Sequence, residues 1–193
     1  MVMTPLTLFV LLLCNFTIVG LAALYCHRVR NGTIGSVLLS AMPAIVALIS
    51  LVPGTFAMAG VPANEFAIAE VLLATSAVIG STLSITLSAM TVAARGPLAQ
   101  QHGSSVDDMQ QYFDCLPYRH VRHPLSSACL LALMAAILAS PHPVMLCCLV
   151  YACVRFSFLA GCEERHLASS AIGPRYRRYL AESGRFFPKL HAG

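Results

Sequence analysis

Residues Pro5–Cys26 read PLTLFVLLLCNFTIVGLAALYC, an apolar stretch without a charged side chain. A helix needs about 20 consecutive apolar residues to cross the hydrocarbon core of a bilayer. No charged side chain precedes the stretch, whereas a cleaved signal peptide begins with positive charge and has a shorter apolar core. We therefore predict a transmembrane helix that stays in the mature protein.

The composition of the whole chain agrees with a membrane protein. Hydrophobic residues make up 58% of the 193 residues and charged residues only 10%, whereas about a quarter of a soluble domain is charged. The formal charge of +4 is modest, and the basic residues form no long run. We therefore expect no nucleic-acid partner.

Eight cysteines occur, but no pair has CxxC spacing. Five of them fall inside apolar stretches, where a free thiol behaves as a small hydrophobic residue. We predict reduced, buried cysteines and no metal site. These five are Cys14, Cys129, Cys147, Cys148 and Cys153.

Four further apolar stretches follow, at 36–51, 65–90, 124–139 and from 143 to about 161. Basic residues flank the first, third and fifth stretches, and Lys and Arg favour the cytoplasmic side of a membrane. The sequence therefore predicts an all-α integral membrane protein with about five transmembrane helices. Its N-terminus would lie outside and its C-terminus in the cytoplasm, and the Ala-rich and Leu-rich spans fit a bacterial inner membrane.

The chain divides at the polar segment that begins near Thr91. We predict that residues 1–90 form the first three transmembrane helices and that residues 91–193 form the functional region. This region would hold a cytoplasmic segment, a tight helical hairpin and a C-terminal tail. In the tail, Tyr176, Tyr179 and Leu180 recur at helical spacing among arginines, a pattern typical of an amphipathic interfacial helix.

The fourth stretch begins at Arg122-His123-Pro124. Proline suits the first helical position, because its missing N–H would be unpaired there in any case. The exposed N–H groups of a helix start favour an anion, and Arg122 adds a full positive charge. This segment is either an anion site or an ordinary basic anchor at the membrane surface.

Glu163 and Glu164 follow the fifth stretch, so a tight hairpin places them opposite Pro124. Adjacent carboxylates at a membrane surface repel each other and are costly to desolvate. At least one of them is expected to hold a hydrogen-bond donor or a cationic ligand. The alternative is a solvated helix end.

Several motifs follow one another in the second half of the chain. Pro117-Tyr118-Arg119-His120-Val121-Arg122-His123-Pro124 precedes Glu163-Glu164, which precedes Gly173, Tyr176 and Tyr179, and Arg185-Phe186-Phe187-Pro188 comes last. In order and nearly in spacing, these motifs resemble those of the isoprenylcysteine carboxyl methyltransferase and phospholipid methyltransferase family. The resemblance implies an integral membrane enzyme that binds S-adenosylmethionine in a cytoplasmic pocket and takes its methyl acceptor from the bilayer.

The resemblance also implies which residues contact the cofactor. Methyl transfer from a sulfonium depends mainly on alignment and exclusion of water, so neither a nucleophilic residue nor a metal is required. The cofactor-binding residues expected from the resemblance are Gln110, Gln111, Tyr112, Phe113, Tyr118, Arg122, His123, Pro124, Leu125, Ser126, Glu163 and Glu164.

Three positions depart from the family pattern. Ser126 stands where a Tyr is usual, Ala128 stands where a Gly is usual, and Leu159 stands where carboxyl methyltransferases tend to carry a basic residue. Arg155 lies one turn further into the fifth stretch and shares a helical stripe with Leu159 and Glu163. We predict that Arg155 orients an acidic methyl acceptor; the alternatives are a pair with Glu70 or a side chain that snorkels to the surface.

The identity of the acceptor stays open, since a carboxylate, an amine, a thiol or a hydroxyl on a small or lipid-like apolar molecule would each fit. Two other functions also remain open. One is a nicotinamide-dependent membrane reductase with a related C-terminal architecture, in which Arg119 and Arg122 would hold the cofactor phosphate. The other is a non-catalytic membrane partner protein that retains the fold.

Overall fold

The computed structural model describes residues 5–29, 45, 68–100, 115–139, 143–170 and 172–189. This part of the chain forms five helices and contains no strand, which confirms the all-α prediction there. The predicted helix at 36–51 lies outside the described residues, Ile45 excepted. The five helices are α1 (Pro5–Val29), α3 (Ile68–Gln100), α5 (Pro124–Ala139), α6 (Pro143–Ala168) and α7 (Gly173–Glu182).

Three of these helices are long and apolar enough to cross a membrane. The qualifying segments are Thr7–Tyr25 in α1, Ala74–Ala94 in α3 and Pro143–Ala168, the whole of α6. Helix α5 is equally apolar but has only 16 residues. At 1.5 Å per residue it is about 24 Å long, shorter than the roughly 30 Å of a hydrocarbon core.

Helix α5 begins and ends at the predicted residues, whereas three other helices run past their predicted ends. Helix α1 continues beyond Cys26 to Val29. Helix α6 continues beyond Gly161 to Ala168, and α3 continues beyond Met90 to Gln100. Glu, Arg and Ala are good helix formers. The end of an apolar stretch therefore marks where the helix loses its apolar surroundings, and the helix itself extends further.

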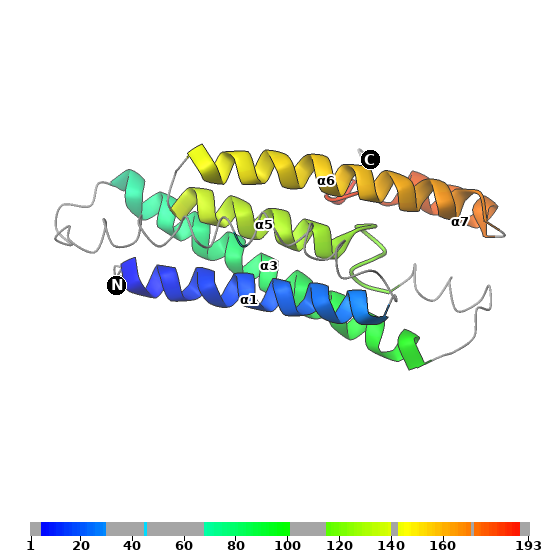
Figure 1. Ribbon diagram of the computed structural model, residues 1–193, viewed down its shortest axis with the longest axis horizontal. Helices are drawn as coiled ribbons and strands as arrows, with labels where there is room; N and C mark the ends of the chain where they lie inside the picture. Colours follow the sequence, from blue (N-terminus) through cyan, green and yellow to red (C-terminus); the bar gives the residue numbers. More distant parts are fainter. Residues whose placement is uncertain are drawn as a thin grey trace.

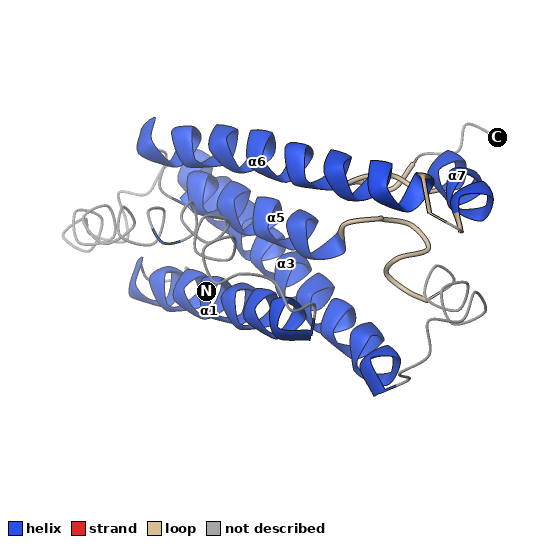
Figure 2. Ribbon diagram, turned by 45° about the vertical axis from the view of Figure 1, so that its right-hand side comes forward, coloured by secondary structure: helices blue, strands red, loops and turns tan. Residues whose placement is uncertain are grey.

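The helices form one bundle, in which α1, α3 and α6 run in one direction and α5 runs in the other (Figure 1). The C-terminal ends of α1, α3 and α6 and the start of α5 thus lie at the same end of the molecule. Helix α7 lies at this end too, beside the last turns of α6 (Figure 2). The predicted topology requires this arrangement, because it assigns all the basic flanks to one side.

Helix α5 occupies the centre of the bundle, where it packs against α1, α3 and α6. Its buried face is rich in alanine, which lets neighbouring helices approach closely. A Cβ added at Gly80 of α3 would lie 3.3 Å from the Ala135 Cβ, and the Ser84 hydroxyl donates a 2.7 Å hydrogen bond to the Ala128 carbonyl. Small residues thus set the spacing of α3 and α5.

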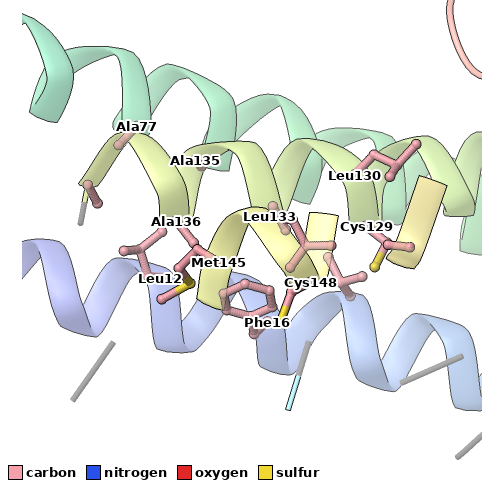
Figure 3. Close-up of a cluster of buried hydrophobic side chains, with 14 of the residues drawn as sticks. Leu12, Phe16, Ala77, Cys129, Leu130, Leu133, Ala135, Ala136, Met145 and Cys148 are labelled. Atoms are coloured by element: carbon pink, nitrogen blue, oxygen red, sulfur yellow. The ribbon is translucent and has the colours of Figure 1, made fainter. Parts of the chain in front are cut away.

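The core around α5 also receives large side chains from α1 and α6. Leu12 and Phe16 of α1 point toward Met145 and Cys148 of α6 and toward Leu133 of α5 (Figure 3). These side chains fill the space between helices at the middle of the bundle, away from the end where α7 lies.

The cysteines do not all lie in this core. Cys129 and Cys148 are buried, as predicted, but Cys14, Cys147 and Cys153 are exposed on the outer faces of their helices. The prediction of burial was wrong for these three. Their apolar surroundings in the sequence are explained by outward faces that would contact lipid, so apolar composition alone does not identify the packed face.

Asn15 is a polar exception inside α1. It is fully buried, yet neither atom of its amide group has a hydrogen-bond partner. The hydroxyls of Ser81 and Ser88, on the buried face of α3, are likewise unpaired. Burying an amide without a hydrogen bond is costly, so packing elsewhere in the bundle offsets this cost.

Candidate functional site

The residues that precede α5 form a compact turn. The N–H groups of Arg119 and Val121 donate to the carbonyls of Cys115 and Pro117, at 3.0 and 3.1 Å. The Tyr118 side chain is 1% exposed, and its carbonyl accepts a 2.6 Å hydrogen bond from the Tyr179 hydroxyl. The ring predicted to contact a cofactor is therefore enclosed by protein.

The segment after α7 lies along this turn and pairs with its backbone. The Gly184 N–H donates to the His120 carbonyl at 3.0 Å, and the Arg122 N–H donates to the Gly184 carbonyl at 2.8 Å. The His123 N–H donates to the Arg185 carbonyl at 3.1 Å. A Cβ at Gly184 would lie 1.6 Å from the Phe187 carbonyl oxygen, so the close approach requires glycine.

Ser127 ties the same segment to α5. Its hydroxyl lies 2.7 Å from the Phe186 carbonyl and 3.0 Å from the His123 carbonyl. Ser127 was not predicted as a site residue, because nothing in the neighbouring sequence distinguishes it from the other small residues of α5. Its role depends on a contact with a residue far along the chain.

The Glu164 carboxylate is the centre of the site. Its Oε1 atom accepts hydrogen bonds from Arg122 Nε at 2.9 Å and Arg185 Nε at 3.2 Å, and its Oε2 atom accepts one from Arg185 Nη2. The Arg122 and Glu164 side chains are each 10% exposed and that of Arg185 is 41% exposed. The predicted meeting of Glu164 with the start of α5 is thus present, as an ion-pair cluster within the protein.

Arg122 also binds the end of α7. Its Nη1 atom donates to the carbonyls of Leu180, at 3.1 Å, and Ser183. Lys189 adds hydrogen bonds to the carbonyls of Leu180 and Ala181, at 2.9 and 2.7 Å. Positive charges near the C-terminus of a helix satisfy its unpaired carbonyls and interact favourably with its dipole. Arg122 therefore connects α5, α6 and α7.

His123 lies between the two glutamates. Its Nε2 atom is 3.4 Å from Glu164 Oε1, and its Nδ1 atom is 3.8 Å from Glu163 Oε2. Burial lowers the pKa of His123 below its usual value, and this effect outweighs the two nearby carboxylates, which raise it. The imidazole is therefore neutral at neutral pH, and its ring packs at a tilt against Phe186.

Glu163 is the more accessible of the two acids, with a side chain 31% exposed against 10% for Glu164. The α5 start beside it consists of Pro124, which is buried, and of Leu125 and Ser126, which are half-buried. The N–H groups of Leu125 and Ser126 donate to none of the backbone carbonyls in the turn before α5 that the structure describes. N–H groups at a helix start are suited to an anion, so the anion site considered from the sequence stays a prediction.

Burial near this cluster keeps two tyrosines protonated. Burial and the nearby Glu164 charge raise the pKa of Tyr176 to about 12, and burial raises the pKa of Tyr179 as well. Both rings pack against each other on the face of α7 that meets the cluster. Neither hydroxyl is a base at neutral pH.

Arg155 lies apart from these residues, eight residues before Glu163 on α6 and hence about 12 Å along its axis. Its Nε atom is buried and has no hydrogen-bond partner. The side chain of Glu70, considered above as a partner for Arg155, lies outside the described side chains. Residues Gln110, Gln111, Tyr112 and Phe113 also lie outside the described part of the chain.

The departures from the family pattern are placed as follows. Ala128 is fully buried and accepts the Ser84 hydrogen bond through its carbonyl, so its methyl group lies in the α3–α5 contact. Ser126 is half-buried in the first turn of α5, and Leu159 is half-buried between Arg155 and Glu163 on α6.

Within the described residues, no three or more His, Cys, Asp or Glu side chains form a group that could hold a metal ion.

Comparison with known proteins adds no relative. No family, curated protein or solved structure matches the chain.

Glu164→Gln should destabilise the protein strongly, because Arg122 and Arg185 would both lose the carboxylate with which they form ion pairs. Removing one partner of a buried ion pair costs about 3 kcal/mol or more, and thermal unfolding in detergent measures the loss as a lower Tm. Glu163→Gln is the matched control, since exposed ion pairs contribute at most about 1 kcal/mol. Equal Tm values for the two variants would contradict the central position of Glu164.

His123 should make stability fall as the pH is lowered. Its pKa is lowered in the folded protein, whereas an unfolded chain has a histidine pKa of about 6.5. Below that pH the unfolded state binds a proton that the folded state resists, so stability is lost as pH falls from about 7 toward 5. His123→Gln should flatten the dependence of Tm on pH in this range.

The exposed His120, in the same turn, supplies the control for this measurement. His120→Gln should leave the slope of Tm against pH intact. An unchanged slope in His123→Gln would show that other groups cause the loss.

Proposed function

We propose that this protein is an S-adenosylmethionine-dependent methyltransferase of a bacterial inner membrane, with a small or lipid-like apolar methyl acceptor. It would be a multi-pass protein with its N-terminus outside and its C-terminus in the cytoplasm. The three long apolar helices support the membrane location. The common end shared by α1, α3 and α6 is consistent with this orientation.

One observation supports the enzyme assignment most directly. The motifs that carry the family resemblance are separated by 40 to 60 positions in the sequence, yet their residues contact one another. Arg122 and Glu164 are 42 positions apart in the sequence, and Tyr118 and Tyr179 are 61 positions apart, yet each pair is joined by a hydrogen bond. Motifs without a common role would have no reason to contact one another in one cluster.

The chemical groups around the cluster fit the proposed cofactor. S-adenosylmethionine carries a carboxylate, an ammonium group and ribose hydroxyls. The N–H groups in the first turn of α5, at Leu125 and Ser126, would hold the carboxylate, and the accessible carboxylate of Glu163 would accept hydrogen bonds from the ammonium or ribose groups. An anion site and an acid thus lie side by side for one zwitterionic molecule.

The same geometry separates contact residues from positioning residues. Arg122 and Glu164 form a hydrogen-bonded ion pair with each other. Arg122 also binds the end of α7, and Glu164 also binds Arg185, so both charges already have partners within the protein. Tyr118 is buried and supports the turn through Tyr179. In this proposal these three residues hold the α5 start opposite Glu163, and Glu163, Leu125 and Ser126 touch the cofactor.

When bound, S-adenosylmethionine supplies a methyl group on a positively charged sulfur. The protein's own contribution is to fix the orientation of acceptor and methyl group and to exclude water. The neutral His123 lies between the two glutamates, and its Nδ1 atom is 3.8 Å from Glu163 Oε2, beyond hydrogen-bond distance. No residue of the cluster has to act as a nucleophile.

Arg155 supports an acceptor with a negative charge. A guanidinium group in an apolar helix is costly unless it meets an anion, and residues of this kind often mark a functional site. Its Nε atom is buried and unpaired, while the neighbouring Tyr151, Val154 and Phe158 are exposed on the outer face of α6. An acidic group on an apolar molecule could reach Arg155 from the bilayer between these side chains.

Glu163→Gln should weaken S-adenosylmethionine binding by roughly tenfold or more, because a hydrogen bond to a charged group contributes about 1.5–3 kcal/mol. Isothermal titration calorimetry on the detergent-solubilised protein would measure the loss. Glu182→Gln, an exposed change on α7 away from the cluster, should bind like the parent.

Titration with NADPH under the same conditions tests the reductase alternative. Heat with NADPH and none with S-adenosylmethionine would favour the reductase, and no heat with either would favour a non-catalytic partner protein. Undiminished S-adenosylmethionine binding by Glu163→Gln would remove Glu163 from the site.

Arg155→Ala should lower methyl transfer into a membrane lipid extract by tenfold or more while leaving S-adenosylmethionine binding unchanged. The reason is that Arg155 lies about 12 Å from Glu163 along α6, within the part assigned to the acceptor. Radiolabelled methyl transfer measures the rate, and Arg155→Lys should restore part of it by returning the charge. Full turnover in Arg155→Ala would contradict this role.

A further inference from the structure

Helix α7 presents a positively charged face that the cluster around Glu164 does not use. The helix buries Gly173 and Tyr176 against α6, and it exposes Arg175, Arg177 and Arg178. The first turn of the helix carries no acidic residue. Burial of one face therefore fixes which way the arginines point.

Two of these arginines have no partner within the described part of the chain. Arg177 donates a 3.3 Å hydrogen bond from Nη1 to the Ala168 carbonyl at the end of α6. Among the residues that the structure describes, neither Arg175 nor Arg178 has a hydrogen-bond or ion-pair partner, even though Glu182 lies one turn beyond Arg178. Their charges are available to a ligand outside the chain.

The surroundings of α7 place this face near the membrane surface. Helix α7 begins five residues after α6 ends, at the end of the bundle where α1 and α3 also end (Figures 1 and 2). The segment 165–189 contains six Lys or Arg residues and a single acidic one. In the segment that follows α7, Phe187 is 64% exposed, and exposed aromatic rings favour the membrane–water interface.

We propose that the exposed face of α7, formed by Arg175, Arg177 and Arg178, binds the anionic headgroups of phospholipids in the membrane that surrounds the helices. This inference rests on the membrane location proposed above and not on the methyltransferase activity. Clusters of basic residues beside a membrane helix attract anionic lipids, with about 1 kcal/mol for each Lys or Arg near the surface. The face has the charge, the accessibility and the position that such binding requires.

The position of α7 gives the binding a second effect. Its C-terminal end is held by Arg122 and Lys189 through the carbonyls of Leu180 and Ala181. A lipid that holds the first turns of α7 would therefore steady the helix at both ends. Anionic lipid should stabilise the folded protein, beyond being attracted to it.

The test uses the full chain purified in a neutral detergent. Short-chain phosphatidylglycerol or phosphatidylcholine is added, and Tm is measured at low and high salt. Phosphatidylglycerol should raise the Tm of the parent more than phosphatidylcholine does, and salt should reduce the difference because exposed charges are screened. Arg175→Gln with Arg178→Gln should weaken the apparent affinity for phosphatidylglycerol by roughly tenfold.

Two controls separate binding from folding. Glu182→Gln changes an exposed charge of the opposite sign on the same helix and should keep the full response. The Tm of the double variant without lipid should equal that of the parent, because both arginines are exposed. Equal stabilisation of the parent by the two lipids, or an equal response in the double variant, would overturn the proposal.

Inorganic phosphate and a short acidic peptide are added in parallel at the same charge concentration. Stabilisation by either one without a preference for phosphatidylglycerol would also overturn it. The readout involves no S-adenosylmethionine, so the lipid result and the cofactor result can fail independently.

Discussion

The organisation of this protein depends on one carboxylate placed between two guanidinium groups. Glu164 is held by Arg122 from the turn before α5 and by Arg185 from the segment after α7. Each of the three residues belongs to a different part of the chain, and each charge is only partly accessible to water. In such surroundings charges are costly unless they are paired, so the three segments have to arrive together.

This constraint leaves the two adjacent glutamates in different surroundings. The charges of Glu164 and Arg122 are neutralised by protein groups, which leaves Glu163 as the acid with an accessible side chain. The backbone pairing of residues 184–185 with 120–123 fixes the turn from the other side. The start of α5 is thus held in place by side chains and backbone that do not themselves need to touch a ligand.

Part of this arrangement follows from the sequence. The apolar stretch 124–139, bounded by proline at both sides, gives the limits of α5, and the hairpin with α6 brings Glu164 to Arg122. The partner Arg185 was quoted in a motif but received no role, because its contact depends on how an irregular segment folds back over the turn. Local propensity says little about such a segment.

Burial was the other property that the sequence did not resolve. The ring of Tyr118 is enclosed, and Cys14, Cys147 and Cys153 lie on outer faces. In a helix that is apolar on all sides, the pattern of hydrophobic residues does not distinguish the face that meets another helix from the face that meets lipid. Asn15 shows the same difficulty in reverse, since a polar residue inside an apolar stretch is fully buried.

The pairing of the turn with residues 183–186 has a consequence for biosynthesis. A ribosome delivers α1 to α6 before it delivers these residues, so a chain that is part-way through synthesis holds Glu164 and Arg122 without Arg185 and without the Gly184 backbone. The helices alone therefore do not complete the cluster around Glu164, which needs the residues that follow α7. A chain clipped before these residues would lose the backbone pairing at Gly184 and the ion pair of Arg185, and with them the contacts that fix the turn before α5.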